Sequence, residues 1–175
     1  MDINALIKNR RAVPPRFLTK QEVQKEVVEQ LLENANWAPN HKETEPWRFK
    51  IFTGEGKSKL AGDIYEFLHN VEKSGGTINL NKAKKLKDNL KRVPVVIAII
   101  LERDKAKRLP EWEEIAAVSM AVQNMWLTAT ALGYGAFWAT PDFMPLLSEI
   151  LKLNGDQKAL GFFYVGHITM EYPSP

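Results

Sequence analysis

The feature that most constrains the fold is a long apolar segment at residues 115–132. Its apolar side chains would occupy every face of a helix, and its only polar residues are Ser119, Gln123, Asn124, Thr128 and Thr130. A helix that is hydrophobic all round is either buried or spans a membrane. The adjacent polar pair at 123 and 124 argues against a membrane span. The segment therefore predicts a long buried helix.

A chain of 175 residues has few other elements with which to cover such a helix. An uncovered apolar stripe is rare on soluble monomers, and a two-fold partner is the commonest way to bury one. We therefore expect this helix to lie at a homodimer interface. Ala117 and Ala121 are four residues apart, and their small side chains would let two helices approach closely.

The rest of the chain alternates between helical and extended patterns. Thr19 and Glu22 form a capping-box pattern before the four-residue repeat that starts at Val23, which predicts a helix over residues 19–34. The unbroken β-branched run 94–101 is typical of a strand buried on both faces. Further helices are expected over 3–9, 57–69, 81–91 and 143–151, and further strands over 47–53, 134–140 and 160–168. This order predicts an α+β fold in a single domain, 1–175.

Composition excludes several chemistries. The chain has no cysteine, which rules out disulfides, thiolate metal sites, Fe–S clusters and a cysteine nucleophile. Residues 82–108 hold ten Lys and Arg against three Asp and Glu, a local net charge of +7. No aromatic residue is interleaved in this run, so we interpret it as a solvated surface and expect no nucleic-acid partner. The N-terminus lacks the apolar core of a secretory signal, so we expect a soluble cytoplasmic protein with no membrane partner.

Two short clusters could bind ligands. Arg10, Arg11 and Arg16 could form an anion site, because guanidinium groups bind phosphate bidentately. The first two could equally offset the dipole of the helix that precedes them, and both interpretations stay open. His41, with Glu43 and Glu45, is the one group with a metal-site composition, which leaves a metal-dependent hydrolase as a weaker alternative. No P-loop is present, because Ile51 occupies the position of its first glycine.

Several motifs, in order, resemble the flavin-dependent nitroreductase family. Residues 10–12 followed by Arg16-Phe17 resemble its Arg-Arg-Ser…Arg-Phe motif, although Ala12 replaces the serine. The loop 38–49 is similar to its Ala-Pro-Ser…Gln-Pro-Trp segment, and it is closest to small members with an Ala-Pro-x-His-Lys loop. Residues 117–124 and 133–138 resemble its long helix and the Gly-x-Gly-x-x-Trp strand that follows, and 161–166 resembles its last core strand.

This resemblance implies a mainly antiparallel central sheet flanked by helices, and a homodimer with FMN at the subunit interface. It implies electron transfer from NAD(P)H to a nitroaromatic, quinone or similar small-molecule acceptor by a ping-pong mechanism. The flavin would carry the chemistry, so no catalytic side chain and no metal is expected. By motif, the cofactor-binding residues would be Arg10, Arg11, Ala12, Arg16, His41, Trp138, Ala139 and Thr140. A flavin-binding or storage module without significant turnover is the main alternative.

Overall fold

The computed structural model describes residues 2–172 and confirms an α+β architecture. Its sheet has the strand order β1-β2-β4-β3, and every neighbouring pair is antiparallel. The strands are β1 (Trp47–Phe52), β2 (Val95–Glu102), β3 (Tyr134–Ala139) and β4 (Gln157–His167). The α-helices are α1 (Ile3–Asn9), α2 (Lys25–Ala35), α3 (Gly54–Lys73), α4 (Leu80–Arg92) and α5 (Glu111–Ala131). Three short 3-10 turns are η1 (Pro15–Phe17), η2 (His41–Glu43) and η3 (Met144–Leu147).

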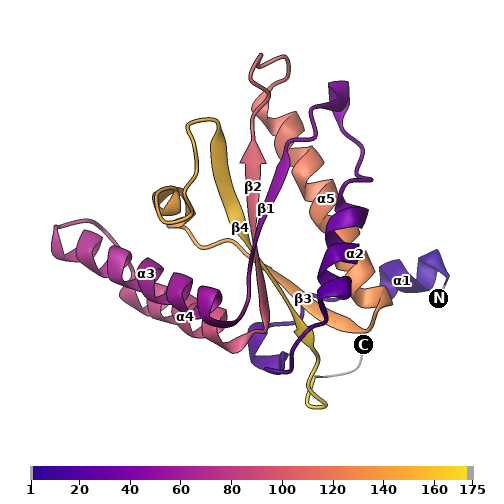
Figure 1. Ribbon diagram of the computed structural model, residues 1–175, viewed down its shortest axis with the longest axis horizontal. Coiled ribbons are helices and arrows are strands. Elements are labelled where there is room, and N and C mark those ends of the chain that lie inside the picture. The colour runs from indigo at the N-terminus through magenta and orange to yellow at the C-terminus, as the bar shows by residue number, and fades with distance from the viewer. Residues whose placement is uncertain (1, 173–175) are drawn as a thin grey trace.

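Helices cover both faces of the sheet. Figure 1 shows α3 and α4 on one side and α2 and α5 on the other. The alternation of side chains along β2 explains this arrangement, since Ile97 and Ile99 belong to the core under α5, whereas Val96 and Ala98 belong to the core under α3 and α4. The prediction of a strand buried on both faces is therefore confirmed.

The long helix α5 is buried along one side only. Ala117 and Ala121 are 2% and 0% exposed and pack into the core of their own chain. The prediction that they form a helix contact between subunits is therefore wrong. An outer stripe of α5 is open instead, and it includes Trp112 and Met120, which are 67% and 39% exposed. The single chain thus leaves apolar surface on α5 uncovered, but on a different face from that of Ala117 and Ala121.

The predicted helix over 19–34 begins only at Lys25. The Thr19 hydroxyl accepts a hydrogen bond from the backbone N–H of Gln21 and closes a local turn rather than capping a helix. The backbone N–H of Thr19 also donates to the carbonyl of His167 at the end of β4, over 2.8 Å. Residues 19–24 therefore follow a non-helical course beside the end of β4, and this contact overrides the capping-box pattern.

The predicted helix over 143–151 is also wrong, because only the single turn η3 forms there. The backbone N–H groups of Leu146 and Lys152 donate to the carbonyls of Phe143 and Glu149, which is the i to i−3 pattern of 3-10 turns rather than that of an α-helix. The segment is instead anchored by Leu147 and Leu151, which are buried in the core under α4. The ammonium of Lys50 closes its end by donating to the carbonyls of Leu151 and Lys152.

None of the helices within residues 2–172 combines the length and the apolar character that crossing a bilayer requires.

Candidate functional site

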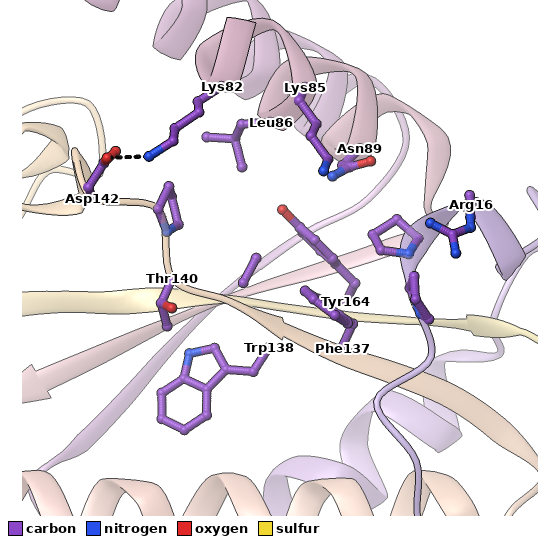
Figure 2. A pocket seen from close by; sticks show the side chains of 14 residues that line it. Arg16, Lys82, Lys85, Leu86, Asn89, Phe137, Trp138, Thr140, Asp142 and Tyr164 are labelled. Atoms are coloured by element: carbon purple, nitrogen blue, oxygen red, sulfur yellow. Dashed lines mark hydrogen bonds and ion pairs between the residues drawn. The ribbon is translucent and has the colours of Figure 1, made fainter. Parts of the chain in front are cut away.

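A cavity of about 700 Å³ lies at the open edge of the sheet, between β3 and helix α4. Figure 2 shows that its residues come from the N-terminal segment, α4, the end of β3, the loop that follows β3, and β4. Small-molecule sites typically have volumes of roughly 300–1,000 Å³. The lining residues are Pro14, Pro15, Arg16, Lys82, Lys85, Leu86, Asn89, Phe137, Trp138, Ala139, Thr140, Pro141, Asp142 and Tyr164.

The N-terminal segment is fixed beside the cavity by the edge strand. Ala12 forms a parallel bridge with Ala136 of β3, and the backbone N–H of Val13 donates to the Ala136 carbonyl over 2.9 Å. This pairing places Pro14 and Arg16 beside β3. The C-terminal end of β3 lines the opposite side of the cavity. Strand β3 therefore brings the motif around Arg16 and the motif around Trp138 to one site, although they are far apart in the sequence.

A glycine fixes the position of Trp138 near the end of β3. The indole Nε1 of Trp138 donates to the carbonyl of Leu160 over 3.3 Å. Gly161 has φ +141°, and a Cβ there would lie 2.4 Å from the carbonyl oxygen of Ala139 and 2.5 Å from Trp138 Nε1. Only glycine fits this close approach, so Gly161 lets the indole pack against β4 on the α5 face of the sheet and fixes the end of β3 at the cavity.

The rim of the cavity is cationic and its floor is apolar. Arg16, Lys82 and Lys85 are exposed at the rim. The Lys82 ammonium forms an ion pair of 2.7 Å with Asp142, and this hydrogen bond lowers the pKa of the Asp142 carboxyl. Tyr164 is fully buried at the floor, where burial raises the pKa of its hydroxyl. The cavity thus offers positive charge outside and a neutral, aromatic surface inside.

The structure brings four of the eight predicted site residues into this cavity, namely Arg16, Trp138, Ala139 and Thr140. Arg10, Arg11 and Ala12 are not part of its wall, although they lie beside the same edge strand. The Arg10 guanidinium sits 5.2 Å from the centre of the Trp126 ring, and the Arg11 guanidinium donates to the carbonyl of Lys8 at the end of α1. The contact of Arg11 supports the helix-end interpretation for that residue, whereas Arg10 packs on an aromatic ring, and the phosphate interpretation stays a prediction for both.

His41 lies away from the cavity of its own chain. Its Nδ1 is 2.9 Å from Oε2 of Glu113 at the start of α5, on the face of the sheet opposite to α4. In residues 2–172 no three His, Asp or Glu side chains cluster in a way that could hold a metal ion. The structure therefore gives no support to a metal centre built on His41, Glu43 and Glu45.

Ten lining residues of the cavity were missed by the sequence analysis, and they include Lys82, Lys85, Asn89, Phe137 and Tyr164. The three on α4 belong to the basic run that was interpreted as solvated surface. Their spacing of three and four residues is the available signal, because it places them on one stripe beside the buried Leu86. Nothing in the sequence indicates that this stripe faces β3, since that contact is tertiary.

Comparison with known proteins gives a consistent result. Residues 7–167 match the nitroreductase family. YfhC of Bacillus subtilis (strain 168), provisionally named an NAD(P)H nitroreductase, is 33% identical over 134 residues, which are 76% of this chain and 66% of that protein. The crystal structure of a nitroreductase-like family protein from Bacillus cereus superposes with a TM-score of 0.81 at 30% identity, covering 100% of this chain and 88% of the other.

A third similarity concerns the fold alone. A provisionally named nitroreductase from Desulfovibrio desulfuricans, crystallised in complex with FMN, superposes with a TM-score of 0.73 at 21% identity. The superposition covers 100% of this chain and 92% of that one.

Proposed function

The chain belongs to the nitroreductase family, and from this membership we propose that it is an FMN-dependent oxidoreductase that passes electrons from NAD(P)H to a nitroaromatic, quinone or similar acceptor. The observation that carries the proposal is the cavity beneath α4, which combines a flat aromatic wall with a cationic rim. The similar fold of a protein crystallised with FMN supports the choice of cofactor.

The residues of the cavity fit the chemistry of FMN. The planar ring of this cofactor needs an apolar slot, and Phe137 and Ala139 of β3 supply one together with Leu86 of α4, whereas the Trp138 indole points to the other face of the sheet (Figure 2). The phosphate needs cations, and Arg16 and Lys82 stand at the rim. The sheet edge is fixed by backbone hydrogen bonds, so the wall that β3 supplies is formed before any ligand enters.

The protein's part in the reaction is to bind, orient and stabilise charge. FMN supplies the hydride and electron chemistry when bound. The cations at the rim would favour the negative charge that develops on a reduced ring, because fixed charges in a site stabilise such charge without reorganisation. The apolar side chains of Leu86, Phe137 and Ala139 would exclude water from the slot.

We also propose that two copies form a homodimer and that the flavin lies near their interface. The uncovered apolar stripe of α5 supports this, together with the exposed Trp37 near its C-terminal half. His41 is remote from the cavity of its own chain, so a role for it at the flavin or nicotinamide requires the loop of a partner subunit. The pairing of His41 with Glu113 would then hold that loop in place.

The first prediction concerns the cofactor and turnover. Purified protein should bind FMN non-covalently, and NAD(P)H should bleach the bound flavin until a nitroaromatic or quinone restores its colour. Because both substrates would use one slot in turn, double-reciprocal plots should give parallel lines. Protein that gains no flavin spectrum on titration with FMN would contradict the proposal, and bleaching by neither nucleotide would favour the storage alternative.

The second prediction concerns Arg10 and Arg11. If they meet the FMN phosphate, replacing either with alanine should weaken FMN binding by about 1.5–3 kcal/mol, the scale of a charge-assisted hydrogen bond. Riboflavin lacks the phosphate and should be affected less, which titration calorimetry can measure. Lys8→Ala is the matched control, because Lys8 is a cation in the last turn of the same helix. Equal losses for FMN and riboflavin would instead assign both arginines to the end of α1.

A further inference from the structure

The hydroxyl of Tyr164 is an unpaired polar group at the floor of the cavity. Tyr164 is 0% exposed, and within residues 2–172 its Oη meets no hydrogen-bond partner. Figure 2 shows the ring rising from β4 toward α4, with its hydroxyl between Leu86 on one side and Lys85 and Asn89 on the other. Leaving a buried hydroxyl without a partner costs roughly 1–3 kcal/mol. A partner that enters the cavity would remove this cost.

The side chain is held so that its hydroxyl keeps this direction. Tyr164 pairs with Phe137 across β3 and β4, and the two rings are stacked with centroids 6.4 Å apart. On its other side Tyr164 pairs with Val96 of the central strand. A ring confined between two strands has little freedom to turn toward another partner, so the hydroxyl is preorganised for a ligand in the cavity.

The surroundings of the hydroxyl select the kind of group it would meet. The cations of the cavity are exposed at its rim, whereas Tyr164 lies at the buried floor beside Leu86. A phosphate would keep its charge near the rim and near water. A neutral acceptor, such as a carbonyl oxygen or ring nitrogen on the polar edge of a heteroaromatic ring, fits a neutral hydroxyl in an apolar setting.

We propose that Tyr164 is a flavin-positioning residue, whose hydroxyl donates a hydrogen bond to an acceptor on the polar edge of the bound flavin ring. This inference rests on the proposed function and adds a residue that no motif of the sequence indicates. The hydrogen bond would exist only when the cavity is filled. The loaded protein would thereby gain an interaction that the empty protein lacks.

The test is Tyr164→Phe, which removes the hydroxyl and keeps the ring. The empty variant should unfold at the same temperature as the parent or at a higher one, because no hydrogen bond of the empty protein is lost. The dissociation constants of FMN, riboflavin and lumiflavin should each rise about tenfold, since all three share the ring and its acceptor would be left unpaired. The absorption spectrum of the bound flavin should shift as well.

Tyr134→Phe is the matched control, because Tyr134 lies on β3 outside the cavity with its ring 4.7 Å from that of His167. It should leave the flavin dissociation constants unchanged. Unchanged constants for Tyr164→Phe, a lower unfolding temperature of its empty form, or a loss confined to FMN would each overturn the assignment. Binding of flavin by the parent tests the proposed function separately, whereas the ratio of variant to parent tests Tyr164.

Discussion

Replacing Met120 with glutamate is expected to dissociate the proposed homodimer and abolish FMN binding with it. Met120 lies on the outer stripe of α5 and is 39% exposed in the single chain. A polar substitution at such a surface position usually changes stability by less than about 0.5 kcal/mol. In an interface the same carboxylate would be desolvated without a partner, which costs several kcal/mol and would raise the dimer dissociation constant by roughly 100-fold or more.

Light scattering and FMN titration on the same samples would check this expectation. Leu146→Glu is the matched control, because Leu146 is 43% exposed but lies on η3, away from α5. It should leave both the mass and the FMN affinity of the parent. A flavin-loaded monomer of 19.9 kDa for the parent would contradict the dimer, and a variant that dissociates yet keeps FMN would place the flavin within one subunit.

The sequence predicted well those elements whose pattern is local. Strand β2 carries apolar residues from Val95 to Leu101 because both of its faces are covered, and this alone identifies it. Helix α5 was equally clear from its composition. The choice of its inner and outer faces was not, because an all-apolar helix has no hydrophobic direction to indicate which side meets the sheet. Ala117 and Ala121 were assigned to the wrong face for this reason.

The predictions that proved wrong depended on distant contacts. Thr19 has the chemistry of an N-cap, yet its backbone pairs with the end of β4, about 150 residues later in the chain. The same limit applies to the site. The motif around Trp138 located one wall of the cavity, whereas Lys85 and Tyr164 reach it only through the packing of α4 and β4 against β3. No spacing in the sequence encodes that packing.

Glu114 is expected to be the most costly single ionisable residue to neutralise. Its side chain is 0% exposed at the start of α5, where it is paired with the Arg103 guanidinium. Its other oxygen accepts the backbone N–H of Asp104 over 2.8 Å. Glu114 therefore ties the end of β2 and the loop after it to the first turn of α5, and it also lies one residue from Glu113, the partner of His41.

Replacing Glu114 with glutamine keeps its shape but puts an amide N–H₂ against one of these two donors. The guanidinium of Arg103 then keeps only the partly exposed Glu111 as a countercharge. Breaking a buried ion pair in this way should lower the free energy of unfolding by about 3 kcal/mol. Urea denaturation would measure the change, with Glu113→Gln as the matched control. The pair of Glu113 with His41 is partly exposed, and exposed pairs contribute only about 0–1 kcal/mol. Equal losses for the two variants would show that the pair of Glu114 with Arg103 does not hold α5 to the sheet.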